Sequence, residues 1–156
     1  METQGQPAVK RPATQILLKE IMKYPPVIVR EDDKFHRVEK ILREYKIKHL
    51  PVVNDAGALV GLITLSDLYR TSSPKKNLEE GTYFYEKETL DKFILKFVMS
   101  QNPKTLKADN TLMDALNTMV NGGFGCIPIV DDQHMIVGIV TQTDLIRAVT
   151  FLLRQA

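Results

Sequence analysis

Apolar positions divide the chain into short segments with two different periodicities. One set recurs every three or four residues, at Phe35, Val38, Ile41, Leu42 and Tyr45. This spacing places side chains on one face of an α-helix. Two aliphatic runs at residues 49–53 and 59–63, with turn-forming residues 54–57 between them, predict a β-hairpin. A short strand is expected at residues 27–29 before the helix, and a second helix near Thr64.

The same order of segments returns in the second half of the chain. Its helical stripe consists of Leu112, Ala115, Leu116, Met119 and Val120. Gly122-Gly123 is expected to end this helix, and residues 126–130 and 136–140 predict a second hairpin. The expected first strand is at residues 105–106 and the last helix at residues 144–153.

A shift of 77 residues aligns residues 22–70 with residues 99–147 without a gap. Twelve of the 49 aligned positions are identical, and in the first copy they are Met22, Pro26, Asp32, Pro51, Val53, Asp55, Val60, Gly61, Thr64, Asp67, Leu68 and Arg70. Because surface loops tolerate changes of length, an ungapped match indicates that one unit has been duplicated.

The two copies predict an α+β fold with two pseudo-symmetric β-α-β-β-α domains packed sheet to sheet. A unit of about 50 residues rarely buries enough core alone, so the copies are expected to pack on each other. The predicted boundaries are a disordered tail at residues 1–13, a first domain at 14–72, a linker at 73–92 and a second domain at 93–156. Three aromatic residues at 83–85 are expected to pack over the core or against a partner.

Composition argues against several classes of partner. The net charge of +2 comes from 21 basic and 19 acidic residues, which leaves no concentrated basic face for nucleic acid. No apolar run approaches the roughly 20 residues that cross a bilayer, so membrane insertion is not expected. A single cysteine and an N-terminal segment without an apolar centre predict a cytoplasmic protein without a disulfide framework.

The residues that could support catalysis are scattered. Cys126 has Gly125 and Ile127 as neighbours and so no adjacent base or cation, which favours a buried strand residue over a nucleophile. The three histidines lack zinc-ligand spacing, and no paired catalytic carboxylates or Walker-type loop occur. The sequence therefore predicts a protein that is not an enzyme, with no metal site and no prosthetic group.

The most specific repeated feature is a Gly-x-x-Thr-x-x-Asp segment at residues 61–67 and 138–144. A threonine three residues before an aspartate is a helix cap, and residues 111–114 have the same spacing at another predicted helix start. A carboxylate at such a position can also accept hydrogen bonds from both hydroxyls of a ribose. The leading glycine either lets the backbone approach another group closely or serves the preceding turn.

Three ordered motifs, each present twice, identify a resemblance to a known family. They are Met-x-x-x-Pro at 22–26 and 99–103, a strand with central proline at 49–53 and 126–130, and the glycine-led segments extended to Leu68 and Leu145. Together they resemble a tandem pair of cystathionine-β-synthase (CBS) domains, also called a Bateman module, over about residues 16–150.

The resemblance implies two clefts between pseudo-symmetric domains that bind an adenosine-containing ligand such as AMP, ADP, ATP, S-adenosylmethionine or NAD. One implied cleft contains Ile63, Thr64, Ser66 and Asp67, facing Thr105, Cys126 and Ile127. The other contains Val140, Thr141, Thr143 and Asp144, facing Ile28, His49 and Leu50. The two aspartates are expected to hold ribose, and the threonines to meet ribose or phosphate.

Lys48 and His49 correspond to Gly125 and Cys126 in the second copy. Because basic residues at this position in related modules touch phosphates, the Asp144 cleft is expected to suit a charged nucleotide better than the Asp67 cleft. The resulting prediction is a regulatory sensor of adenine nucleotide that forms a homodimer and acts on an unidentified protein. The alternative is a protein-interaction scaffold whose clefts are vestigial.

Overall fold

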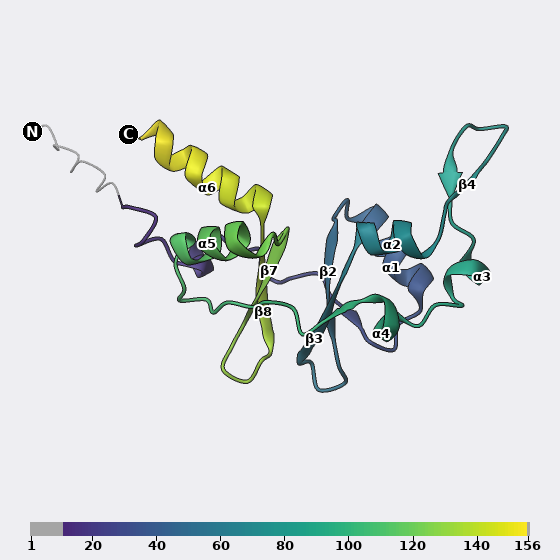
Figure 1. The fold of residues 1–156 in the computed structure, drawn as a ribbon, viewed down its shortest axis with the longest axis horizontal. Helices are drawn as coiled ribbons and strands as arrows, with labels where there is room; N and C mark the ends of the chain where they lie inside the picture. Colours follow the sequence, from purple (N-terminus) through teal and green to yellow (C-terminus); the bar gives the residue numbers. More distant parts are fainter. Residues whose placement is uncertain (1–10, 156) are drawn as a thin grey trace, which may run out of the picture.

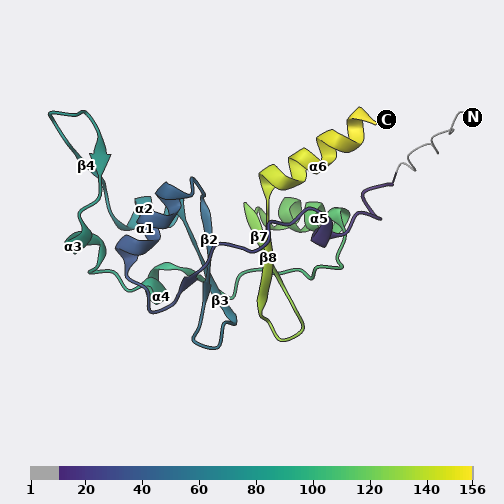
Figure 2. The same ribbon diagram turned by 180° about the vertical axis from the view of Figure 1, so that it is seen from behind.

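The computed structural model describes residues 11–155. The first ten residues of the predicted tail, and Ala156 at the end of the predicted second domain, lie outside the described residues. Figures 1 and 2 show two β-hairpins side by side at the centre of the molecule, with helices on the outer side of each. The predicted architecture of two similar α+β halves is confirmed.

The first half is built on one four-stranded sheet. Its elements are β1 (Val29–Arg30), α1 (Phe35–Glu44), β2 (His49–Val53), β3 (Leu59–Thr64) and α2 (Leu65–Thr71). β1 is parallel to β2, and β2 is antiparallel to β3. Phe35, Val38 and Leu42 of α1 are fully or almost fully buried, so most of the predicted apolar stripe faces the core.

The second half repeats this order with a two-stranded sheet. Its elements are α5 (Leu112–Gly122), β7 (Cys126–Val130), β8 (Ile136–Thr141) and α6 (Gln142–Arg154). Gly123 follows α5 with a φ of 66°, a left-handed conformation that glycine adopts without strain. Val120 of the predicted stripe is 80% exposed, so the buried face of α5 is narrower than expected.

Both predicted first strands are shorter than the sequence pattern indicates. Only Val29 and Arg30 of the first copy pair with β2, and Leu106 of the second copy makes a single parallel bridge to Ile129. Val27 and Ile28 of the predicted strand lie outside the paired residues, and Ile28 is 39% exposed.

The predicted linker has more structure than its composition indicates. It contains β4 (Lys75–Lys76), β5 (Tyr83–Phe84) and α3 (Lys87–Leu90), and α4 (Leu95–Val98) follows it. β4 and β5 form an antiparallel hairpin that extends beyond α2 at one end of the molecule (Figure 1). Leu90 and Leu95 are buried in the core of the first half.

The two halves exchange the segments that precede them. The helical turn η1 (Leu18–Glu20) precedes the first half, but Leu18 is buried in the core of the second half. In return, β6 (Ser100–Gln101), which leads into the second half, adds to β3 as the edge strand of the first sheet. The hairpin loops also meet, because the Leu59 N–H donates to the His134 carbonyl at 3.1 Å.

Candidate ligand-binding clefts

Both glycine-led segments place the threonine at the end of a strand and the aspartate in the first turn of a helix. Thr64 caps α2 and Thr141 caps α6, and each hydroxyl accepts from the N–H of the aspartate three residues later. The aspartate in turn accepts from the threonine N–H, at 2.8 Å for Asp67 and 2.9 Å for Asp144. The same reciprocal bonds join Thr111 and Asp114. Helix capping is therefore a shown role of the Thr-x-x-Asp spacing.

The two aspartates share the contact made by carboxylate oxygen Oδ2 and differ in the contact made by Oδ1. Oδ2 of each accepts from its own threonine hydroxyl at 2.8 Å. Oδ1 of Asp67 pairs with the Arg70 guanidinium one helical turn later. Oδ1 of Asp144 instead faces the Lys23 ammonium at 3.6 Å, a contact from the other half of the chain. Both carboxylates are buried, so a ligand must displace a cation to reach either.

The repeated glycines allow the exchanged lead-in segments to pack closely against β3 and β8. A Cβ atom on Gly61 would overlap the Met99 side chain, and one on Gly138 would overlap Met22. Each methionine belongs to the lead-in segment of the opposite copy. Of the two roles considered for these glycines, the structure supports close packing.

A cavity of about 410 Å³ lies where the Asp144 segment meets the first half. Its lining combines the lead-in residues Lys23, Pro25, Pro26 and Val27, the entry to β2 at residues 46–49, and Gly125, Ile139, Thr141, Gln142 and Thr143 of the second half. The volume is within the range of small-molecule sites. The first residues of the 13-residue helix α6 form one wall, and a helix N-terminus favours anions.

The charges around this cavity are mainly positive. Lys23, Lys46 and Lys48 all line it, and among the described residues no carboxylate pairs with Lys46 or Lys48 at 4.0 Å or less. The His49 ring packs over Gly125, where a Cβ atom would lie 2.8 Å from Nε2. Burial, and then the charge of Lys48, lower the pKa of His49, so its imidazole is neutral at neutral pH.

Four of the predicted residues of this cleft line the cavity, and four do not. Lys48, His49, Thr141 and Thr143 line it. Leu50 and Val140 are fully buried in the two cores. Ile28 is 39% exposed and lines a separate hollow beside α1. Asp144 lines another hollow together with Arg147 and Phe151 of α6.

Lys23 and Lys46 are the charged lining residues that sequence reasoning missed. Lys23 is placed by two backbone hydrogen bonds with Ile139, at 2.9 and 3.2 Å. Lys46 ends the turn after α1 with a φ of 52°. Both lysines lie within three residues of a predicted site residue or a repeat motif, so their sequence positions marked them as candidates. Their convergence on one cavity depends on the packing of the two halves, which the sequence does not show.

The predicted residues of the Asp67 cleft have varied environments. Ser66 is exposed, Thr64 and Thr105 are partly buried, and Ile127 is fully buried in the second core. Cys126 lies opposite Thr141 in the β7–β8 pair. Burial raises the pKa of the Cys126 thiol to about 12, so the group is protonated and a poor nucleophile at neutral pH.

Residues 11–155 contain no cluster of three or more His, Cys, Asp or Glu side chains that could hold a metal ion. None of the helices in this range has the length and apolarity needed to cross a membrane.

The chain matches the family model of the CBS domain twice, at residues 18–73 and 95–150. It is 33% identical over 153 residues to the uncharacterized protein MJ1426 of Methanocaldococcus jannaschii, covering 85% of this chain and 90% of that protein. It is 31% identical over 140 residues to the L-aspartate semialdehyde sulfurtransferase of the same organism. The latter match covers 89% of this chain and 24% of that enzyme.

Solved structures show the same fold. The CBS domain pair of protein MJ0100, in complex with 5′-methylthioadenosine and S-adenosyl-L-methionine, matches with a TM-score of 0.69 and 28% identity over 85% of this chain and 98% of that chain. CBSX2, a CBS-pair protein from Arabidopsis thaliana, matches with a TM-score of 0.72 and 23% identity over 90% and 99% of the two chains. The repeats, the paired hairpins and both family matches lead to one conclusion: the chain belongs to the CBS domain family and contains a tandem CBS pair.

Proposed function

We propose that this CBS pair is a regulatory sensor that binds an adenine nucleotide in the cavity between Lys23, Lys48 and the start of α6. The single observation that carries the proposal is the convergence of three lysines on a cavity of about 410 Å³. Phosphate groups are the natural partners of clustered ammonium groups at a helix N-terminus. The CBS pair of MJ0100, whose complex contains two adenosyl compounds, supports an adenosine moiety in the same ligand.

The lysines favour a phosphorylated ligand over the adenosyl compounds of that relative. 5′-Methylthioadenosine carries no anionic group, and the single carboxylate of S-adenosylmethionine is outweighed by its sulfonium and ammonium groups, so neither brings net negative charge to the lysines. AMP, ADP and ATP each carry the anionic charge that the cavity lacks. Ribose binding by Asp144 accompanies this proposal and requires Lys23 to move from the carboxylate to the phosphates.

Signalling requires that the ligand bind two conformations with different affinities. The cavity wall comes from both copies, so a bound nucleotide links the lead-in segment and β2 of the first copy to α6 of the second. We propose that this contact changes the angle between the halves, and that a homodimer presents the change to a regulated protein.

A thermal-shift panel of AMP, ADP, ATP, NAD and S-adenosylmethionine tests the proposal. A nucleotide at 100 times its Kd should raise the melting temperature by about 5–10 °C. Adenosine is the matched probe without phosphate and should give a much smaller shift. If none of the ligands shifts the melting temperature, the alternative of a scaffold with vestigial clefts is favoured.

Substitution of a lysine that lines the cavity tests whether the phosphate groups bind there. Lys48→Ala should lower the affinity for the best nucleotide by about tenfold or more and leave the affinity for adenosine nearly unchanged. Lys96→Ala is the matched control, because Lys96 is an exposed lysine on α4. Equal nucleotide affinity in the wild type and Lys48→Ala, measured by isothermal titration calorimetry, contradicts the assignment of the phosphates to this cavity.

A further inference from the structure

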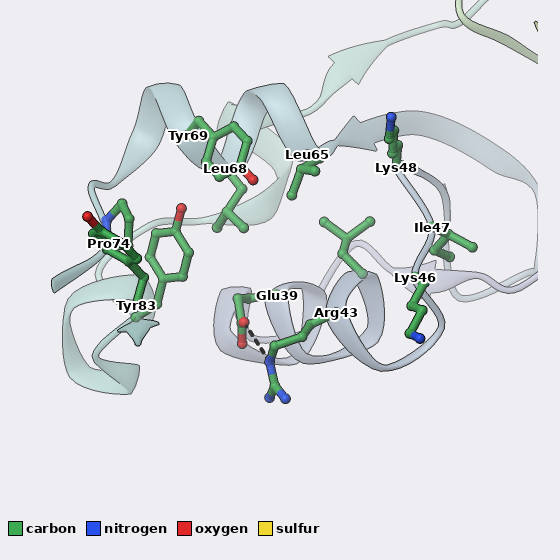
Figure 3. Close-up of a pocket in the computed structure, with 12 residues that line it drawn as sticks. Glu39, Arg43, Lys46, Ile47, Lys48, Leu65, Leu68, Tyr69, Pro74 and Tyr83 are labelled. Carbon is green, nitrogen blue, oxygen red and sulfur yellow. Dashed lines mark hydrogen bonds and ion pairs between the residues drawn. The ribbon is translucent and has the colours of Figure 1, made fainter. Parts of the chain in front are cut away.

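A second cavity lies on the helical side of the first half. It has a volume of about 660 Å³, is open to solvent on one side, and is lined by α1, α2, the segment at residues 46–48 and the linker residues Pro74, Tyr83 and Tyr85. Figure 3 shows Leu65, Leu68 and Tyr69 of α2 facing Glu39 and Arg43 of α1 across this space. The segment at residues 46–48 lines this cavity and the nucleotide cavity alike, so the two sites share one wall.

The interior of this cavity is apolar and aromatic. Leu42 and Leu68 belong to the buried core and form part of its floor. Tyr69 and Tyr83 line it and remain 58% and 67% exposed. Aromatic rings with polar edges bury large apolar area against a ligand at low entropic cost. This lining suits a flat aromatic or aliphatic body.

One polar group on the lining is unpaired. The hydroxyl of Tyr85 is buried and has no hydrogen-bond partner among the described residues. Burial raises the pKa of this phenol, so it remains a neutral donor. A buried hydroxyl without a partner is costly, and a small rotation of the Tyr85 side chain would let a polar group of a bound molecule satisfy it.

The charges lie at one end of the cavity. Arg43 is neutralised by Glu39, with Nε 3.0 Å from Oε1. Lys46 and Lys48 are exposed and form no ion pair with another described residue. Figure 3 places them at the end opposite Tyr83 and Pro74, with their ammonium groups pointing in opposite directions. The cavity therefore has an aromatic end and an end flanked by two flexible cationic side chains.

We propose that this cavity is a second ligand site, which binds a small amphipathic anion. The apolar body of the ligand lies between the leucines of the core and the tyrosines of α2 and β5. Its carboxylate, sulfonate or phosphate lies at the end formed by Lys46 and Lys48, and a polar atom along its body meets the Tyr85 hydroxyl. Lys46 and Lys48 line both cavities, so the two ligands share these ammonium groups, while the apolar and aromatic lining belongs to this site alone.

A pair of fluorescent probes tests both parts of the proposal. 8-Anilinonaphthalene-1-sulfonate has an aromatic body and one anionic group, and N-phenyl-1-naphthylamine is the same body without the sulfonate. Fluorescence titration of the full chain should show saturable binding of the sulfonate probe, with the neutral probe about tenfold weaker because it lacks the charged contact. Equal affinity for the two probes overturns the anionic part of the proposal.

Substitutions of the aromatic lining test whether the sulfonate probe binds in this cavity. Tyr69→Ala and Tyr83→Ala should each weaken the sulfonate probe by about fivefold to tenfold, since each removes an aromatic contact. Both side chains are more than half exposed, so neither substitution should lower the melting temperature. An unchanged melting temperature then shows that the variant is folded. Gln142→Ala, which alters the lining of the nucleotide cavity alone, is the matched control and should bind the probe as the wild type does.

Three results overturn the site. One is an unchanged probe affinity in both tyrosine variants. Another is an equal loss in Gln142→Ala, which places the probe in the nucleotide cavity. The third is a change of oligomeric state, measured by light scattering, in which the wild type is a dimer and Tyr69→Ala is a monomer. That result would show that a second copy of the chain, and not a small molecule, covers this face.

Discussion

At the scale of single residues, one sequence motif has two environments in this molecule. Thr64-x-x-Asp67 and Thr141-x-x-Asp144 make the same cap. Arg70 pairs with the first carboxylate from its own helix, whereas Lys23 pairs with the second from the lead-in segment that is hydrogen-bonded to β8. Arg147, the counterpart of Arg70, forms no ion pair with Asp144 among the described contacts. The identical residues therefore do not make the clefts equivalent.

This difference predicts unequal effects of the two aspartate substitutions. Asp144→Ala should cost about 1.5–3 kcal/mol of nucleotide binding, because a carboxylate that accepts from ribose hydroxyls is lost. Asp67→Ala should leave that affinity nearly unchanged. Each should also lower the free energy of unfolding by about 1 kcal/mol through the lost cap. Calorimetry and urea denaturation measure the two effects, and equal binding in both variants would contradict ribose binding by Asp144.

The packing of Met22 on Gly138 leads to a prediction about stability. In Gly138→Ala the new methyl group overlaps Met22 and lies 3.2 Å from the Lys23 carbonyl, which accepts from the Ile139 N–H. Overpacking of this kind costs about 1–3 kcal/mol. Adding Met22→Ala should recover part of the loss, because it removes the overlapping atoms. Urea denaturation of the single and double variants measures the free energy of unfolding. If the loss in the double variant equals the sum of the losses in the two single variants, the contact between residue 138 and Met22 is not the cause.

At the scale of secondary structure, the elements that the sequence predicts are those that bury apolar residues in a regular pattern. α1 and α5 each bury one face, and β2 and β7 are continuous apolar runs buried along almost their whole length. The β4–β5 hairpin consists of two exposed two-residue strands, so no alternating pattern marks it. For the same reason the cavity beneath this hairpin had no signal in the sequence. The three lysines of the nucleotide cavity come from separate elements, so only the packed halves show their convergence.

His49, the first residue of β2, leads to a prediction that the stability of the protein depends on pH. His49 has a pKa in the folded protein below its ordinary value of about 6.5, because of burial and then the charge of Lys48. As pH falls below about 6.5, the unfolded chain takes up the proton first. The contribution of His49 to stability is thus complete above about pH 6.5 and is lost as pH falls toward the lower, folded pKa.

His49→Gln should therefore lose less stability than the wild type between about pH 7.5 and about pH 5.5. Urea denaturation at the two pH values measures the difference. His134→Asn is the control, because His134 is exposed in a turn with positive φ, which asparagine tolerates. A decline in His49→Gln as steep as that of the wild type would show that other groups cause it.

At the scale of the whole molecule, the exchange of lead-in segments makes the two CBS repeats one folding unit. Leu18, Ile21 and Met22 pack in the core of the second repeat, although they lie at the start of the first. Leu95 and Met99 pack in the core of the first repeat, although they lie at the start of the second. A fragment cut between the repeats therefore lacks part of its own core.

This exchange predicts that residues 93–156 do not fold alone. The fragment lacks fully buried Leu18 and the hydrogen bonds from the N–H groups of Leu18 and Lys19 to Asn110 and Ala108. Loss of one fully buried leucine side chain costs about 2–5 kcal/mol, which is comparable with the whole stability of a small domain. Circular dichroism of the fragment should show little cooperative unfolding. The full chain should unfold in a single transition with the same midpoint in far-UV and near-UV signals. Joining residues 11–24 to the fragment through a flexible linker should restore cooperative unfolding, and a fragment that melts cooperatively without them would show that the repeats fold independently.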